Sequence, residues 1–183
     1  MNIVISHEGT DFDALASMFA VSKLYPGTRI IIGGSVNRNV RRFLTLYGTF
    51  FNYSIEKELD WKSVKKIWIV DASSPSRSGK AEELIQAGRV AFAIYDHHPE
   101  TPDGLKGEQV VVQPTGACTT ILVELIKEQT LPLNSLEATL LILGIYEDTG
   151  SLTFPTTTAR DLQAAAFLVE HGAKLSAIPD YVN

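Results

Sequence analysis

The chain has 183 residues, of which 45% are hydrophobic and 20% charged, so it has enough apolar side chains for the core of one domain over residues 1–183. Its net charge of -5 argues against a protein that grips nucleic acid through a basic surface, although bound metal ions would reverse the local field at a phosphate site. With one cysteine it can form no intrachain disulfide, and no apolar run approaches the ~20 residues of a membrane span, so we expect a cytoplasmic protein.

Short apolar runs alternate with helical periodicity in the first half of the chain, which predicts βαβ units. We expect strands over residues 2–6, 29–32, 66–70, 89–95 and 110–112, the last at a sheet edge, with helices over 12–24, 38–47 and 77–87. The second half is mostly helical, with helices expected over 115–129, 135–147 and 158–170 and another beginning within 175–182. The pattern predicts an α/β fold, a doubly wound and mainly parallel sheet with helices on both faces.

Acidic residues and histidines stand at the ends of four apolar segments, and three of the four histidines belong to two of these clusters. In a doubly wound sheet, ligands collect at the carboxyl ends of the strands. Carboxylates that converge there repel one another unless cations bind between them. Histidine and aspartate together suit a hard or borderline divalent ion, so we predict a two-metal phosphoester site holding Mn²⁺ or Mg²⁺. The residues are His7, Asp11, Asp13, Asp71, Asp96, His97, His98 and Asp148.

Each motif also has a purely structural interpretation. Asp11 is placed to cap a helix, Asp71 to form an Asx turn, and Asp148 to sit in the last turn of a helix. Capping does not account for His7, and a solvent-facing role does not account for two adjacent histidines after Asp96. These alternatives stay open for each motif taken alone.

Other residues with reactive or basic groups have two interpretations as well. Gly116 and the amides after it could bind a phosphate at a helix start. Arg77 and Lys80 could reach a phosphate from beside the second motif, or could form a solvated helix face. Cys118 lies near a helix start, where its pKa could be lowered, or it could be a small core residue. The acidic pair at 147–148 meets the negative end of a helix dipole, which a nearby cation would relieve.

Taken together and in this order, the four motifs resemble those of the DHH phosphoesterase family over essentially the whole chain. The family includes manganese-dependent inorganic pyrophosphatases, exopolyphosphatases, single-strand-specific exonucleases, and enzymes that cleave short or cyclic oligonucleotides. Thr10 and Phe12 depart from the family pattern, since they replace its usual proline and glycine, but neither residue is a ligand. The motifs are His7-x3-Asp11-x-Asp13, Asp71, Asp96-His97-His98 and Asp148.

The resemblance implies a role for each of these residues. The ligands of one ion would be His7 and Asp11, and those of the other Asp13, His97 and Asp148, with Asp71 bridging the two. Asp96 would orient the cluster from just outside it and His98 would contact the substrate phosphate, so that Asp71, Asp96 and His98 are the expected catalytic group. Two metal ions about 3.5–4 Å apart would lower the pKa of a bridging water and clamp the phosphoryl oxygens during hydrolysis.

The segments 10–18 and 144–154 look closest to the DHH module at the front of large bacterial proteins. In those proteins, CBS domains and a poly(A) polymerase or CCA-adding tRNA nucleotidyltransferase head follow. The resemblance implies that this chain is a piece of a longer tRNA-processing protein and that it lacks the family's second, DHHA1-type substrate-binding domain. It also implies that the module hydrolyses phosphodiester bonds of RNA or a short oligonucleotide. No membrane partner is expected. Two alternatives stay open: a non-catalytic metal- or nucleotide-binding regulatory module of that polymerase, and a manganese-dependent inorganic pyrophosphatase.

Overall fold

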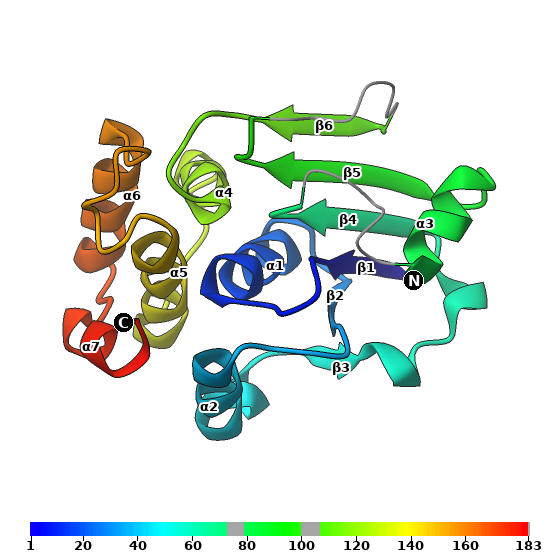
Figure 1. The fold of residues 1–183 in the computed structure, drawn as a ribbon, viewed down its shortest axis with the longest axis horizontal. Helices are drawn as coiled ribbons and strands as arrows, with labels where there is room; N and C mark the ends of the chain where they lie inside the picture. The colour runs from blue at the N-terminus through cyan, green and yellow to red at the C-terminus, as the bar shows by residue number, and fades with distance from the viewer. Residues whose placement is uncertain (73–78, 100–106, 183) are drawn as a thin grey trace.

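The computed structural model of the protein describes residues 1–72, 79–99 and 107–182. Its strands are β1 (Asn2–Ile5), β2 (Thr28–Ile32), β3 (Tyr53–Ile55), β4 (Lys66–Val70), β5 (Ala91–Asp96) and β6 (Gln109–Val112). They form one parallel sheet in the order β3-β2-β1-β4-β5-β6. The arrowheads of β4, β5 and β6 point the same way, toward α1 and α4 (Figure 1).

Helices cover both faces of this sheet. They are α1 (Phe12–Leu24), α2 (Arg38–Tyr47), α3 (Gly79–Gln86), α4 (Cys118–Glu128), α5 (Ser135–Asp148), α6 (Ala159–Glu170) and α7 (Ile178–Tyr181). Residues of α1, α2 and α4 share the core on one face, whereas α3 packs on the other. Because α5 packs on α1, and α6 on α4 and α5, these helices form a layer farther from the sheet (Figure 1).

Helix α1 is buried on nearly all sides because it lies between the sheet and α5. The structure buries 11 of its 13 residues. The contact with α5 is close, since a Cβ atom added at Gly144 would lie 2.8 Å from the Cβ of Ala16 and 3.0 Å from the carbonyl oxygen of Phe12. The glycine in α5 therefore lets the end of this helix approach the start of α1.

The order of the strands places the topological switch point of the sheet between β1 and β4. Strands β2 and β3 extend the sheet on one side of β1, and β4, β5 and β6 extend it on the other. Loops after β1 and β4 therefore leave the sheet toward opposite sides, which is where doubly wound folds bind ligands. The first two predicted motifs follow these two strands.

The structure confirms the predicted fold class, with a sheet that is parallel throughout its described strands. Strand β3 was not predicted, because it has only three residues, which lie at the sheet edge and are too few for their alternation to indicate a strand. The helix expected over 77–87 runs from Gly79 to Gln86, and residues 77 and 78 lie outside the described residues. Short 3₁₀ turns cover Gly48–Phe50, Glu56–Glu58, Trp61–Ser63 and Leu175–Ala177.

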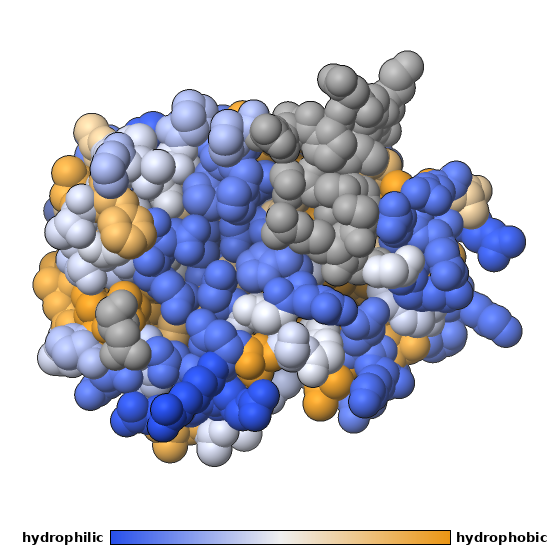
Figure 2. Space-filling model, in the orientation of Figure 1, coloured by the Kyte–Doolittle hydropathy of each residue, from blue (hydrophilic) through white to orange (hydrophobic). Residues whose placement is uncertain are grey.

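The face of the molecule in Figure 2 is mainly hydrophilic, and its hydrophobic residues are scattered in small groups. This agrees with a core whose large apolar side chains are enclosed between the sheet and the helices. No helix in the described part of the chain is long and apolar enough to cross a lipid bilayer.

Candidate metal centre

The predicted site residues converge at the carboxyl end of the sheet. His7 and Asp11 lie in the loop between β1 and α1, Asp71 directly follows β4, and Asp96 ends β5. Asp148 is the last residue of α5, which lies in the layer of helices farther from the sheet. The backbone of Asp71 has a φ of +50°, which is a strained conformation for a residue other than glycine and is typical of functional sites.

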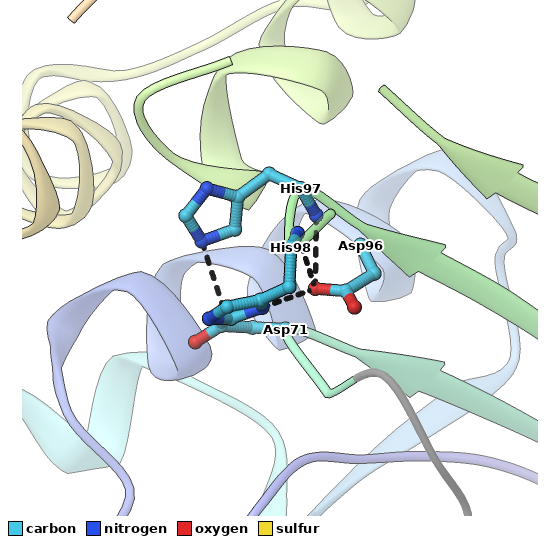
Figure 3. Close-up of side chains that lie close together, drawn as sticks. All are labelled: Asp71, Asp96, His97 and His98. Carbon is cyan, nitrogen blue, oxygen red and sulfur yellow. Dashed lines mark hydrogen bonds and ion pairs between the residues drawn. The ribbon is translucent and has the colours of Figure 1, made fainter. Parts of the chain in front are cut away.

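Asp71 lies between two groups of side chains, and each of its carboxylate oxygens faces one of them. On one side, the Nε2 of His7 lies 3.3 Å from Oδ2 of Asp71 and 3.6 Å from Oδ2 of Asp11. On the other side, the Nε2 of His97 lies 3.4 Å from Oδ1 of Asp71 (Figure 3). The second group is completed by Oδ2 of Asp148 and Oδ2 of Asp13, at 3.3 Å and 3.8 Å from the Nε2 of His97.

Both histidines are oriented by backbone carbonyl groups. Nδ1 of His7 lies 2.8 Å from the carbonyl oxygen of Glu8, and Nδ1 of His97 lies 3.0 Å from that of Thr115. A carbonyl oxygen only accepts, so each Nδ1 carries the hydrogen in this arrangement. The lone pair of a neutral ring is then on Nε2, the atom that faces Asp71 in both cases, as is usual for histidines that bind metals.

The two aspartates of the first motif are fixed by helix N-termini. Oδ1 of Asp11 accepts from the N–H of Ala14 at 2.9 Å and caps α1, while its Oδ2 faces His7. The capping and ligand interpretations of Asp11 are therefore compatible. The fully buried Asp13 accepts from the N–H groups of Cys118 and Thr119 at 2.7 and 2.8 Å, so it caps α4 from a different helix.

Asp96 and His98 form a pair beside these two groups. Oδ1 of the buried Asp96 accepts from Nδ1 of His98 at 2.7 Å and from the N–H of His97 at 2.8 Å (Figure 3). The side chain of His98 is 45% exposed, whereas that of His97 is 11% exposed. The hydrogen bond to Asp96 raises the pKa of His98, which favours the protonated ring. His98 is thus the solvent-facing histidine of the cluster, and Asp96 favours its protonated form.

His7 and His97, the two histidines that face Asp71, have raised pKa values as long as only carboxylates surround them. The hydrogen bond with Asp71 raises the pKa of His7 to about 9 against the opposite effect of burial. Burial lowers the pKa of His97, but the neighbouring carboxylates of Asp148 and Asp71 outweigh it and raise that pKa to about 11. A divalent cation would take the place of these protons, since a histidine ligand binds metal in its neutral form.

The carboxylates have perturbed pKa values because they are crowded and dehydrated. Burial raises the pKa of Asp11 to about 6, and the charge of Asp71 adds to this effect. Burial also raises the pKa of Asp13 well above its usual range. Burial acts in the same direction on Asp71, but the hydrogen bond with His7 and the neighbouring ring of His97 outweigh it and hold its pKa below the ordinary value. Such crowding is relieved when cations bind among the carboxylates.

The donor atoms of this cluster fit divalent metal ions. Among the described residues, Oδ1 of Asp71 and Nε2 of His97 are buried polar atoms without a hydrogen-bond partner. Buried polar atoms are normally satisfied, so two such atoms that face each other indicate a site for another group. Carboxylate oxygens and imidazole nitrogens are ligands that manganese and magnesium accept. The chain therefore holds a His/Asp cluster capable of binding metal ions.

Comparison with known proteins identifies the family. A model described as the DHH family, N-terminal domain, matches residues 2–145. The chain belongs to the DHH family. Its members are metal-dependent phosphoesterases, which agrees with the His/Asp cluster at the end of this sheet.

Two relatives of this DHH domain are described as A-adding tRNA nucleotidyltransferases. The protein of Geobacter sulfurreducens is 37% identical over 184 residues, covering 100% of this chain and 21% of the relative. That of Aquifex aeolicus is 36% identical over 180 residues, covering 98% of this chain and 20% of the relative. This chain therefore spans about a fifth of the length of these relatives, which are larger proteins with further segments.

A solved structure with the same fold is that of an exopolyphosphatase-related protein from Bacteroides fragilis. It superposes with a TM-score of 0.80 and 16% sequence identity, covering 98% of this chain and 55% of that chain. The likeness supports the fold of the DHH domain, including the helices that follow the sheet.

Two residues outside the predicted motifs, Glu147 and Asn37, support the cluster from outside. The carboxylate of Glu147 accepts from the N–H of Phe12 and, at 3.3 Å, from Nδ2 of Asn37. Burial raises the pKa of Glu147 to about 7. The unfavourable charge of this residue at the end of α5 is thus relieved by the N-terminus of α1, whereas Asp148 faces the cluster. The acidic pair was visible in the sequence, but the partner of its first member was not.

The structure gives the remaining predicted residues other contacts. The N–H of Gly116 donates to Oδ2 of Asp161 at 2.9 Å, so this amide already has an acceptor, and its role in substrate binding stays a prediction. Lys80 forms an ion pair with Glu83, and Arg77 lies outside the described residues. Cys118 is fully buried and its pKa is raised well above the usual value, chiefly by burial, which agrees with the core interpretation.

Proposed function

We propose that this DHH domain is a two-metal phosphoesterase module. The observation that carries the proposal is the placement of Asp71, whose two carboxylate oxygens face two different His/Asp groups. His7 and Asp11 would hold one ion, and Asp13, His97 and Asp148 the other, with Asp71 shared between them. Mn²⁺ or Mg²⁺ is the proposed metal, because the ligand set is built from carboxylates and imidazoles.

Each residue of the site has a distinct task in this proposal. The bound ions would supply a nucleophilic hydroxide at neutral pH and neutralise the phosphoryl oxygens. The protonated ring of His98 would donate a hydrogen bond to a phosphate oxygen of the substrate, since it is the exposed member of the cluster. Asp96 keeps that ring oriented and cationic through its 2.7 Å hydrogen bond. Gly116 would stand beside the phosphate at the start of α4.

The proposed substrate class is short or single-stranded RNA, or a nucleotide, with a phosphodiester bond to be hydrolysed. The support comes from the relatives, which are described as A-adding tRNA nucleotidyltransferases and are about five times longer than this chain. We infer a module of a larger protein that processes RNA 3′ ends. Its partners would be RNA and the other parts of the parent chain, including CBS and nucleotidyltransferase domains and a segment that completes the substrate site.

A second candidate function is a regulatory module that binds metal or nucleotide without turnover. The observation that favours it is the description of the relatives, because the nucleotidyl transfer that their names state is not the hydrolytic chemistry of a DHH centre. A pyrophosphatase activity would use the same ligands and is therefore a third outcome to be measured.

The test is turnover by the purified chain, and by the longer protein that contains it, in the presence of Mn²⁺. Substrates are a labelled short oligoribonucleotide and inorganic pyrophosphate, and the products measured are mononucleotides and phosphate. We expect mononucleotide release that falls about 10²-fold in His98→Gln, because a donor to the phosphate is lost. The matched control is His171→Gln, which removes an exposed histidine at the end of α6.

The outcomes separate the candidate functions. Phosphate release from pyrophosphate without mononucleotide release would favour the pyrophosphatase. Metal binding without turnover of either substrate, in the longer protein as well, would overturn the catalytic proposal and favour the regulatory module.

A further inference from the structure

We propose that Asp161, on α6, is a positioning residue for the metal group formed by Asp13, His97 and Asp148. The inference rests on the proposed function, because it concerns the metal affinity of the same cluster. Asp161 lies beyond the segment matched by the family model, which ends at residue 145. It contacts none of the candidate ligands directly and would act through the loop before α4.

Asp161 is a fully buried carboxylate that accepts four hydrogen bonds. Its Oδ2 accepts from the N–H of Gly116 at 2.9 Å and from the N–H and Oγ1 of Thr158, both at 2.7 Å. Its Oδ1 accepts from Oγ1 of Thr120 at 2.5 Å. The bonds to Thr158 form the capping box of α6, a local role. Those to Gly116 and Thr120 reach the start of α4, which a local cap does not require.

The loop that Asp161 holds is the one that orients His97. The N–H of Gly116 donates to Asp161, and the carbonyl of the preceding residue, Thr115, accepts from Nδ1 of His97 at 3.0 Å. The same peptide unit thus connects the buried carboxylate with the imidazole. Hydrogen-bond partners on the far side of a metal-binding imidazole fix its orientation and its tautomer.

Close packing leaves this peptide unit little freedom to move. A Cβ atom added at Gly116 would lie 2.8 Å from Oδ2 of Asp161 and 2.6 Å from Cγ2 of Thr149. One residue before Asp161, Arg160 binds the same loop, with its Nη2 at 2.5 Å from Oε1 of Gln113. The N-terminus of α6 therefore clamps the loop at two points.

The start of α4 is held by carboxylates from two sides. Asp13 accepts from the N–H groups of Cys118 and Thr119, and Asp161 accepts from that of Gly116. Loss of Asp161 would release one side of this arrangement and let the loop shift relative to Asp13 and His97. His7, in contrast, is oriented by the carbonyl of Glu8 in the β1–α1 loop, which Asp161 does not touch. The effect is therefore confined to one of the two metal groups.

The experiment is a Mn²⁺ titration of the chain, followed by electron paramagnetic resonance, for the wild type, Asp161→Asn and Asp161→Ala. We expect two binding steps in the wild type, one of which weakens by about tenfold or more in both variants, while the other is unchanged. The matched control is Glu137→Ala. Glu137 occupies the same capping-box position in α5 as Asp161 does in α6.

A second readout needs no metal. Amide hydrogen exchange in the metal-free chain should become faster at residues 115–119 in Asp161→Asn and stay unchanged there in Glu137→Ala. Equal affinities of both binding steps in the wild type and Asp161→Asn would overturn the inference and leave the proposed function intact. A wild type that binds no Mn²⁺ would instead contradict the proposed function itself.

Discussion

Asp71 shows how one side chain can organise a site that draws on four parts of the chain. It follows a buried strand, and its own N–H donates to the carbonyl of Tyr95 in the neighbouring strand, at 3.0 Å. A backbone φ of +50° directs its carboxylate between the two histidines. Aspartate tolerates this left-handed conformation better than most residues, so the strain is small relative to what the position provides.

The proposed role of Asp71 as a bridge between two metal ions predicts unequal losses of metal. We expect Asp71→Asn to lose most of both ions, because the shared carboxylate is neutralised. Asp148→Asn should lose mainly one ion, since Asp148 belongs to the group with His97 and not to the group with His7. Elemental analysis of manganese after dialysis, for the wild type and both variants, measures this directly. Equal losses in the two variants would contradict the assignment of Asp71 as the bridge.

Asp161 predicts a pH dependence of stability that involves no metal ligand. Burial alone would raise its pKa, but hydrogen bonds from Thr120, Thr158 and Gly116 outweigh it and lower the pKa in the folded chain. A lowered folded-state pKa gives stability that is present above the unfolded value of about 3.9 and is lost as the pH falls through the folded value.

The variant for this prediction is Asp161→Asn. In urea denaturation with a chelator present, the difference in free energy of unfolding between the wild type and Asp161→Asn should be largest near neutral pH and shrink below about pH 4. A difference that stays constant down to pH 3 would show that the charge of Asp161 has no part in its contribution.

At the scale of elements, the crossing of α1 and α5 connects the beginning of the domain to its last candidate ligand. The crossing is close at Gly144, where a Cβ atom would lie 2.7 Å from Oγ1 of Thr119 and 2.8 Å from the Cβ of Ala16. Nearby, Glu147 accepts from the N–H of Phe12. The orientation of Asp148 toward the cluster therefore depends on how α5 packs on α1.

This packing predicts that Gly144→Ala destabilises the fold. The added methyl group would overpack the crossing, and we expect a loss of about 1–3 kcal/mol in the free energy of unfolding, measured by chemical denaturation. Gly34→Ala is the control, because a Cβ atom there meets nothing within 4 Å. If both variants unfold at the same denaturant concentration, the crossing is looser than described.

The elements also show what sequence can and cannot predict. The helix expected over 12–24 matches α1 because Asp11 caps its start and Tyr25-Pro26-Gly27 stops it, which are local signals. Strand β3 has no such signal, since its pairing with β2 is a long-range contact. The same distinction holds in the site. The motifs at strand ends were visible locally, whereas the bond from Gly116 to Asp161 joins distant segments that no local pattern connects.

At the scale of the whole molecule, Cys118 reports on cooperative opening. It is fully buried, and its Sγ donates to the carbonyl oxygen of Tyr95 in β5 at 3.2 Å, so we expect the thiol to become accessible when α4 separates from the sheet. We expect slow labelling by a thiol reagent in the native state and fast labelling in denaturant. Added Mn²⁺ should slow native labelling further, because a ligand that binds only the folded state shifts the opening equilibrium.

The same labelling experiment has a variant that should remove the effect of the metal. Asp71→Asn should abolish the protection by Mn²⁺, because it removes the carboxylate shared by both metal groups. A labelling rate that is fast in the native state, or unaffected by Mn²⁺ in the wild type, would contradict the coupling of metal binding to the core.

The distance in sequence between His7 and Asp148 has a consequence for biosynthesis. The ribosome releases the β1–α1 loop early, but the ligand set that contains Asp148 closes only after α5 has been synthesised and has packed on α1. A nascent chain in which α5 has not yet packed therefore lacks one carboxylate of the proposed metal group formed by Asp13, His97 and Asp148. In the proposed site, that group would discriminate between ions only after the domain has folded.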